Sequence, residues 1–240
     1  MKTEKYNVIA LIPAYQPNEN LKILVNELKK RKFRIVIVND GSEEKYTEIF
    51  KKISDKATVL SYQKNLGKGH ALKNGLEYII SVYKKNFTVV TLDADGQHRV
   101  SDAVKLAYKS LSNKDCLILG SRKINGNVPF RSKFGNTITR FVFKKKTGLY
   151  IYDTQTGLRA FSNRLAEYLL KIPGSGYEYE MNVLMQCTYD KIPVIEERIE
   201  TIYLKGNKSS HFNPIHDSVK IYKAIFNFKK KSGGKNNVDK

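Results

Sequence analysis

The feature that most constrains the fold of this chain is an alternation of short apolar runs with longer amphipathic stretches over the first 120 residues. Runs such as Val8–Ile12, Arg34–Val38 and Phe87–Leu92 are rich in β-branched residues, and each is followed by a stretch with helical spacing of its apolar residues. This alternation is typical of βαβ units and predicts an α/β fold with a mostly parallel sheet flanked by helices. Because ligands of such sheets bind beyond the carboxyl ends of the strands, the residues that follow each run are the first candidates for a site.

Polar residues follow three of these runs. Asp40 comes two residues after the run Arg34–Val38, a Gly-rich segment (Asn65–Gly69) follows a further run at Ala57–Tyr62, and Asp93 and Asp95 follow Phe87–Leu92. The Gly-rich segment lacks the spacing of a P-loop. Two carboxylates one residue apart repel each other unless a cation lies between them, and such ligands suit Mg²⁺ or Mn²⁺ together with phosphate oxygens of a substrate. Two simpler interpretations stay open, a capped turn at Asp40 and a solvated acidic turn at Asp93.

Basic residues outnumber acidic ones by 43 to 23, which gives a net charge of +20. Such a surplus is compatible with nucleic acid, an anionic membrane surface or a phosphate-bearing substrate as partner. The sequence contains no RNA-binding aromatic motif, no zinc-finger spacing and no basic heptad helix, so we expect no nucleic-acid partner. It also has two distant cysteines, no signal sequence and no apolar run of about 18 residues, so we expect a cytoplasmic protein whose membrane contact is peripheral.

Taken in order, the segments IPAYQPNENL, IVIVNDGS, NLGKGHALKNG and LDADGQH resemble the motifs of the family 2 inverting glycosyltransferases over residues 6–98. GSR and DTQTGLRAF, further along, are similar to the branch that contains dolichyl-phosphate mannose synthase and dolichyl-phosphate glucosyltransferase. The resemblance implies a single GT-A (Rossmann-like) domain with a DXD motif. Its expected parts are a nucleotide-sugar half (1–120), an acceptor half with a C-terminal amphipathic helix (121–228) and a disordered basic tail (229–240).

The resemblance also implies roles for individual residues on the donor side. The predicted ligands of a Mg²⁺ or Mn²⁺ ion on the donor diphosphate are Asp93, Asp95 and Gln97. The predicted nucleotide-binding residues are Pro13, Tyr15 and Asp40 beside the nucleoside, Asp93 on the ribose, and Lys68, Asp95 and His211 near the diphosphate.

The acceptor site is predicted between Cys116 and Tyr152, where the periodic pattern weakens and the chain contains eight Lys or Arg and no acidic residue. A phosphate acceptor is already ionised near neutral pH and needs cations more than a base, and the predicted catalytic cations are Arg122 and Arg131. Asp153 is the third predicted catalytic residue, as a group that orients the acceptor or the donor sugar. The alternative for Asp153 is a buried structural carboxylate that caps a turn.

These observations predict a metal-dependent transfer of a hexose, with a UDP-hexose favoured as donor, to a polyprenyl phosphate at the inner face of the cell membrane. The runner-up is a hydroxyl acceptor on a cell-surface glycan precursor or a protein. In that case Asp153, Glu178 or Glu180 would act as the base, although a carboxylate at a helix start is the simpler interpretation of the two glutamates.

Two basic segments are candidates for contact with an anionic membrane surface. In the first, Phe141, Val142 and Phe143 precede three lysines (144–146), a combination predicted to insert at an anionic interface. The second is an amphipathic helix predicted over residues 217–231, which could instead pack on the domain. A separate membrane protein as partner stays open.

Overall fold

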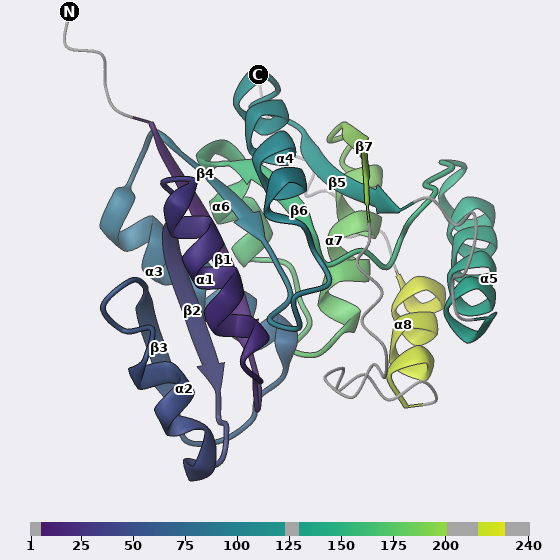
Figure 1. Cartoon of the computed structure of the whole chain (residues 1–240). Coiled ribbons are helices and arrows are strands. Elements are labelled where there is room, and N and C mark those ends of the chain that lie inside the picture. The colour runs from purple at the N-terminus through teal and green to yellow at the C-terminus, as the bar shows by residue number, and fades with distance from the viewer. Residues whose placement is uncertain (1–5, 123–129, 201–215, 229–240) are drawn as a thin grey trace, which may run out of the picture.

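The computed structural model describes residues 6–122, 130–200 and 216–228, without the side chains of residues 130–136 and 216. Within these ranges seven strands form one sheet in the order β3-β2-β1-β4-β6-β5-β7 (Figure 1). The strands are β1 (Asn7–Ala14), β2 (Arg34–Asp40), β3 (Thr58–Tyr62), β4 (Phe87–Thr91), β5 (Leu117–Arg122), β6 (Arg159–Ser162) and β7 (Val194–Ile199). β6 runs antiparallel to β4 and β5, and the other pairs are parallel. The predicted α/β fold with a mostly parallel sheet is confirmed.

Helices cover both faces of this sheet. They are α1 (Asn20–Lys30), α2 (Thr47–Lys51), α3 (Lys68–Tyr83), α4 (Val100–Ser112), α5 (Phe130–Thr147), α6 (Asn163–Leu170), α7 (Glu178–Tyr189) and α8 (His216–Asn227), with a short 3₁₀ turn at Glu44–Tyr46. α1, α2 and α4 pack on one face, and α3, α6 and α7 pack on the other. β1 contributes to both layers, with Ile9 and Leu11 facing α3 and its neighbours and Ala10 and Ile12 facing the α1 layer, because successive side chains of a strand point to opposite faces.

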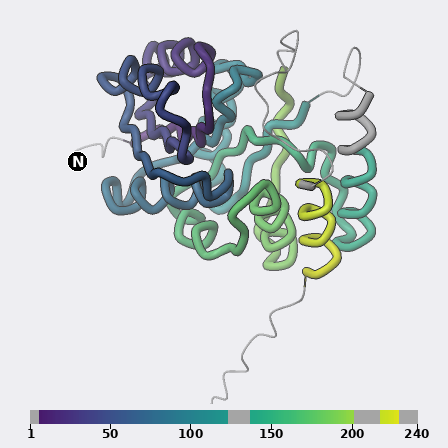
Figure 2. The backbone as a smooth tube through the Cα atoms, turned by 90° about the horizontal axis from the view of Figure 1, so that it is seen from below, coloured from purple at the N-terminus to yellow at the C-terminus, as the bar shows by residue number. Residues whose placement is uncertain are grey.

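α5 and α8 lie side by side at one end of the molecule, next to α7 (Figures 1 and 2). Phe143 of α5 and Ile221 and Ile225 of α8 are buried, so the inner faces of both helices pack on the domain. The predicted apolar wedge of residues 141–143 is therefore wrong for Phe143, which belongs to the core, whereas Phe141 is 68% exposed. Among the helices of the described ranges, none has the length and apolarity needed to cross a bilayer.

The carboxyl ends of β1, β2, β4 and β5 lie at one edge of the sheet, because these four strands run in the same direction. The segment that enters β6 starts from this edge too, since Arg159 at the start of β6 pairs with Thr91 at the end of β4. The topology thus brings Asp93, Arg122 and the segment 153–158 to one edge of the sheet.

Candidate functional site

An ion cluster lies directly after β4. The Nζ atom of Lys68, the first residue of α3, is 2.7 Å from Oδ1 of Asp93 and 2.8 Å from Oε2 of Glu180. His98 approaches the other oxygen of Asp93, with Nε2 3.2 Å from Oδ2. The side chains of Lys68 and Glu180 are 13% and 12% exposed, whereas that of Asp93 is 32% exposed. The cluster therefore joins α3, the end of β4 and α7, and leaves the Asp93 side chain partly exposed.

The two carboxylates of the Asp-Ala-Asp segment have opposite electrostatic surroundings. Burial raises the pKa of Asp93, but the charge of Lys68 and the contact with His98 outweigh burial and hold the pKa well below the usual 3.8. Burial and the negative charge of Asp93 raise the pKa of Asp95. Burial lowers the pKa of Lys68, but the charges of Asp93 and Glu180 outweigh burial and raise the pKa above its usual value, so the ammonium stays charged. A further cation near Asp95 would relieve the repulsion between the two carboxylates.

The surroundings of these carboxylates fit a divalent cation that is shared with a ligand. A Cβ atom on Gly157 would lie 2.3 Å from Oδ2 of Asp93, so only glycine allows this close cradle around the carboxylate. The backbone N–H of Gln97 donates to Oδ1 of Asp95, and the side chain of Asn20 donates to the Asp95 carbonyl oxygen. The described residues contain no group of three His, Cys, Asp or Glu side chains that could hold a metal. Oxygen ligands from a bound phosphate group and water would complete such a site, as is usual for Mg²⁺.

The Gly-rich segment after β3 owes its glycines to close packing against the chain that leads into α7. A Cβ atom on Gly67 would lie 2.5 Å from the carbonyl oxygen of Ser175, and one on Gly69 would lie 2.5 Å from Cβ of Tyr179. The N–H of His70 donates to the same Ser175 carbonyl at 2.8 Å. The two segments therefore hold each other, and this contact brings the start of α3 to the start of α7.

Asp40 supports the same segment from the end of β2. Its carboxylate accepts hydrogen bonds from the hydroxyl of Tyr62 at 2.8 Å and from the N–H groups of Leu66 at 2.8 Å and Gly67 at 3.0 Å. Asp40 is 3% exposed, so these protein groups take up most of its accessible surface. Its predicted contact with a nucleoside stays a prediction.

On the acceptor side, Arg122 and Asp153 form a two-pronged ion pair. Nε of Arg122 donates to Oδ2 of Asp153 at 2.5 Å, and Nη2 donates to Oδ1 at 2.9 Å. Asp153 is fully buried, and the Arg122 side chain is 25% exposed. Glu196 of β7 accepts hydrogen bonds from the N–H groups of Tyr152 and Asp153 and so fixes this turn. The carboxylate of Asp153 therefore orients Arg122, and its predicted contact with a substrate stays a prediction.

Of the remaining predicted site residues, the structure describes the side chains of some and not of others. Pro13 and Tyr15 lie at the end of β1, at the same edge of the sheet as Asp93, and both are half-buried. The Arg131 side chain and the whole of His211 lie outside the described residues. The contact of Asp93 with His98 was not predicted, although the LDADGQH motif contains both residues.

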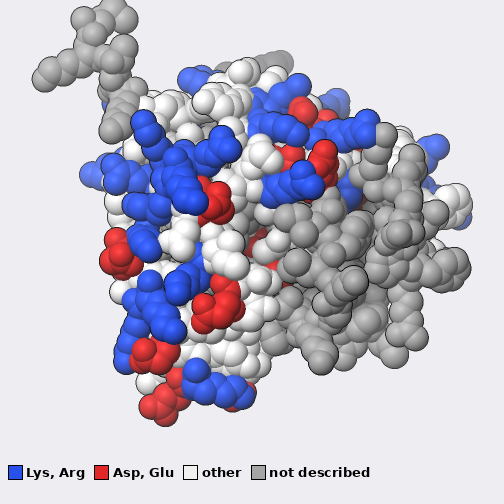
Figure 3. Space-filling view, in the orientation of Figure 1, with Lys and Arg blue, Asp and Glu red and all other residues white. Residues whose placement is uncertain are grey.

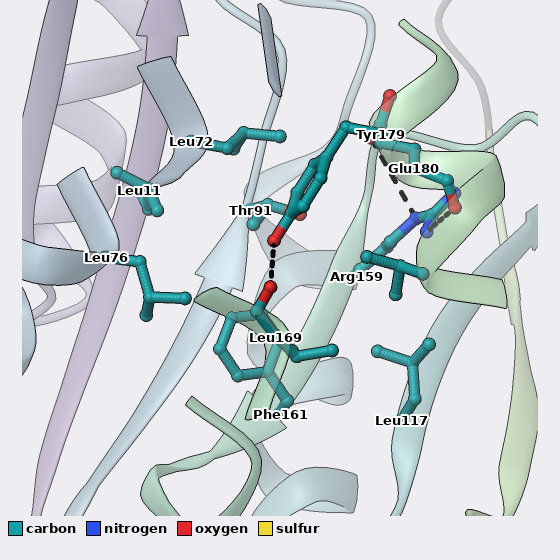
Figure 4. Close-up of a pocket in the computed structure, with 11 residues that line it drawn as sticks. Leu11, Leu72, Leu76, Thr91, Leu117, Arg159, Phe161, Leu169, Tyr179 and Glu180 are labelled. Carbon is teal, nitrogen blue, oxygen red and sulfur yellow. Dashed lines mark hydrogen bonds and ion pairs between the residues drawn. The ribbon is translucent and has the colours of Figure 1, made fainter. Parts of the chain in front are cut away.

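A small cavity lies next to Glu180, between the sheet and helices α3, α6 and α7 (Figure 4). Its volume is about 30 Å³, which is room for one or two water molecules, and apolar side chains, five of them leucines, form most of its lining. Nη1 of Arg159 donates to the Glu180 carbonyl oxygen at 2.7 Å. Nη2 of Arg159 and Oε1 of Glu180 have no hydrogen-bond partner among the described residues. With this volume the cavity is too small for a sugar nucleotide.

Comparison with known proteins agrees with this geometry. The model of the family described as glycosyl transferase family 2 matches residues 9–169. The UDP-N-acetylglucosamine–dolichyl-phosphate N-acetylglucosaminyltransferase of Methanococcus voltae is 29% identical over 218 residues, which cover 82% of this chain and 86% of that protein. The human dolichyl-phosphate β-glucosyltransferase is 24% identical over 235 residues, which cover 86% of this chain and 70% of that protein.

Among solved structures, glucosyl-3-phosphoglycerate synthase from Mycobacterium tuberculosis, in complex with Mn²⁺, UDP and phosphoglyceric acid, superposes with a TM-score of 0.68 at 15% identity. The match covers 92% of this chain and 78% of that one. The sheet order, the carboxylates at the strand ends and these similarities define a glycosyltransferase with a GT-A fold. The chain belongs to glycosyl transferase family 2. Its resemblance to the dolichyl-phosphate branch is confirmed by the relatives' names.

Proposed function

We propose that this enzyme transfers a hexose or N-acetylhexosamine from a UDP-sugar to a polyprenyl phosphate, with Mg²⁺ or Mn²⁺ as its cofactor. The observation that carries the proposal is the pair Asp93 and Asp95 at the end of β4, where Lys68 balances one carboxylate while burial and repulsion from Asp93 raise the pKa of the other. Such a pair suits a divalent cation on a diphosphate. Two dolichyl-phosphate relatives and the UDP and Mn²⁺ complex of a structural neighbour support the choice of donor and acceptor.

The transfer breaks the bond between the anomeric carbon and the diphosphate and forms a bond to an oxygen of the acceptor phosphate, with inversion. That oxygen is ionised near neutral pH, so the attack requires no base. A bound divalent cation supplies neutralisation of the charge on the departing diphosphate. In this proposal Asp93, Asp95 and Gln97 hold the cation, and Arg122 binds the acceptor phosphate with its guanidinium plane fixed by Asp153.

The contacts of the candidate bases favour a phosphate acceptor over a hydroxyl acceptor. Asp153 is bonded to Arg122, and Glu180 is bonded to Lys68. Glu178 accepts hydrogen bonds from two backbone N–H groups that precede α7, as expected for a carboxylate at a helix start. Each carboxylate therefore has a positioning role in the fold, which suits a reaction that does not need proton removal.

We further propose that the enzyme meets its lipid acceptor at the inner face of the cell membrane through the outer faces of α5 and α8, here called the α5–α8 surface. Phe141 and Phe226 are 68% and 63% exposed there, and Nζ of Lys146 lies 3.5 Å from the Phe226 carbonyl oxygen, which links the ends of the two helices. The exposed members of this surface are Phe141, Lys144, Lys145, Lys146, Val219, Lys220, Lys223 and Phe226. Apolar side chains beside lysines suit an anionic bilayer, where each lysine contributes about 1 kcal/mol.

Ligand-induced thermal stabilisation tests the donor. UDP-glucose or UDP-N-acetylglucosamine with Mn²⁺ should raise the melting temperature, since a ligand at about 100 times its Kd stabilises a protein by roughly 2.7 kcal/mol. A shift with GDP-mannose alone would contradict the choice of UDP. Transfer assays with a polyprenyl phosphate and the matching polyprenol then test the acceptor, and glycosylation of the polyprenol would favour the hydroxyl alternative.

A further inference from the structure

The contact between Lys68 and Asp93 opposes cation binding at the end of β4. The Lys68 ammonium lies 2.7 Å from Oδ1 of Asp93, a carboxylate that the proposed function assigns to a divalent cation. Two cations on one carboxylate repel each other, and in a partly buried site this repulsion is only weakly screened. Lys68 therefore lowers the affinity of Asp93 for a divalent cation as long as it stays in contact.

Glu180 gives the ammonium a second carboxylate partner. Its Oε2 atom lies 2.8 Å from Nζ of Lys68, and the ring centroid of Tyr177 lies 5.7 Å from the same nitrogen. A buried ammonium without a carboxylate partner would be costly. Because Glu180 comes from α7 and Asp93 from the end of β4, Lys68 can loosen its contact with Asp93 and still keep a charged partner.

We propose that Lys68 is an exchangeable counter-ion of Asp93, which keeps the divalent-cation site weak until a nucleoside diphosphate binds. This proposal rests on the proposed function. A diphosphate brings anionic oxygens for the divalent cation and for Lys68, so it compensates both positive charges at once. Binding of the cation and of the nucleotide is then strongly coupled, and each raises the affinity for the other by the same factor.

The exposed fractions of the three side chains support the replacement of Lys68 by a divalent cation as the counter-ion of Asp93. Asp93 is 32% exposed, whereas Lys68 and Glu180 are 13% and 12% exposed. The Asp93 side chain is thus more accessible to a ligand than the ammonium that it contacts. A permanent structural ion pair would instead leave the coupling between cation and nucleotide unchanged when Lys68 is replaced.

Binding of Mn²⁺ to the full chain, measured by electron paramagnetic resonance of the free ion with and without UDP, tests the proposal. In the unaltered protein, UDP should raise the affinity for Mn²⁺. Lys68→Met should raise the affinity for Mn²⁺ alone by roughly fivefold or more and should reduce the effect of UDP. Glu180→Gln leaves Asp93 as the carboxylate partner of Lys68, so this variant should lower the affinity for Mn²⁺ alone.

Lys73→Met is the matched control, because it removes the same charge from the same helix. Nζ of Lys73 lies 3.4 Å from the carbonyl oxygen of Ile172, away from Asp93, so Mn²⁺ affinity should stay unchanged. Lys68→Met and Glu180→Gln each leave a buried charge with one partner fewer, and both should lose stability. The expected changes in Mn²⁺ affinity have opposite signs, so a general folding defect cannot produce both.

Unchanged Mn²⁺ affinity and an unchanged UDP effect in Lys68→Met would overturn the counter-ion role and leave the proposed function intact. Shifts of the same sign in Lys68→Met and Glu180→Gln would overturn it too. If the unaltered protein binds neither UDP nor Mn²⁺ with UDP, the proposed function fails and the counter-ion role fails with it.

Discussion

Asp93 and Asp95 are separated by a single alanine, and their different surroundings lead to different expectations for the two side chains. Asp95→Asn should leave the fold intact, because the residue lies in a loop beyond β4, but it removes a charged ligand of the proposed cation. We expect turnover to fall by roughly 100-fold or more, since the loss of several kcal/mol of charge stabilisation has this effect. Steady-state assays in excess Mn²⁺ measure the change.

The control for this variant is Asp115→Asn, which removes a carboxylate that is 68% exposed and pairs with Arg164 outside the candidate site. Its turnover should match that of the unaltered enzyme. Near-normal activity of Asp95→Asn would remove Asp95 from the proposed metal ligands.

Stability in the absence of metal should separate the same two aspartates. The lowered pKa of Asp93 means that the fold favours its charged form, so Asp93→Asn should lower the free energy of unfolding at pH 7. This contribution of Asp93 is present above the usual pKa of 3.8 and is lost as the pH falls through the lower folded-state pKa. The raised pKa of Asp95 means that the fold disfavours its charged form, so Asp95→Asn should leave the free energy of unfolding unchanged or higher. Urea unfolding with a chelator at pH 7 measures both, and an equal loss would contradict this account.

Local sequence patterns were sufficient to predict that Asp93 and Asp95 directly follow a strand and that a helix starts near Lys68, because an apolar run and a Gly-rich helix entry are local signals. They were insufficient for the contact of Lys68 with Glu180. Nothing in the NLGKG or YEYE segments shows that the two meet, since their contact depends on the close approach that Gly67 and Gly69 allow. The pairing of Arg122 with Asp153 was missed for the same reason, because these residues are far apart in the sequence.

Among the structural elements, the α5–α8 surface is expected to affect membrane binding without affecting the transfer reaction itself. Replacing Lys144, Lys145 and Lys146 by Gln should weaken binding to anionic vesicles by roughly 100-fold, given about 1 kcal/mol per lysine. The apparent KM for a long-chain acceptor should rise. Hydrolysis of the sugar nucleotide, and transfer to a short water-soluble prenyl phosphate, should change little, because these lysines are exposed on the outer face of the domain. Vesicle sedimentation and paired kinetic assays measure these effects.

A matched control replaces Lys29, Lys30 and Lys32 by Gln, which removes the same charge from exposed positions at the end of α1 and just beyond it. This variant should bind vesicles almost as well as the unaltered enzyme. Equal kinetic losses of the Lys144–Lys146 variant with both acceptors would assign these lysines to the active site or the fold, and unchanged vesicle binding would assign docking to α8.

Two elements were not predicted as regular structure. β6 has only four residues (RAFS), too few for an alternating pattern to stand out. α5 combines basic and apolar residues with a glycine at position 135, and its apolar residues show no clear helical period. By contrast, β1, β2 and β4 were predicted, because runs buried on both faces are mostly apolar and easily seen.

For the whole molecule, the net charge of +20 does not by itself identify a partner. Figure 3 shows basic side chains distributed over the described part of one face, with acidic side chains between them. Many of these charges are paired on the surface, as in the contacts of Lys30 with Glu27 and Lys51 with Glu48. The location of a partner site therefore has to be inferred from particular clusters.

The place of β6 in the sheet predicts that the nucleotide-sugar half is not an independent unit. A fragment of residues 1–122 contains β4 and β5 but lacks the strand that lies between them. Unpaired strand edges promote aggregation, so we expect this fragment to be insoluble or to unfold without cooperativity. Gel filtration and urea titration test this, and a monomeric fragment with a cooperative transition would contradict it.

The central position of β6 also affects the order in which the chain can fold during its synthesis. Thr88 of β4 pairs with Ser162 of β6, so when β4 and β5 have left the ribosome their common neighbour has not yet emerged. Sheet completion must wait for the DTQTG turn, and contacts of such long sequence separation form slowly. The turn that carries Asp153 and Gly157 therefore emerges just before the strand that joins β4 to β5, so Asp93 on the donor side and Arg122 on the acceptor side gain these two partners only late in folding.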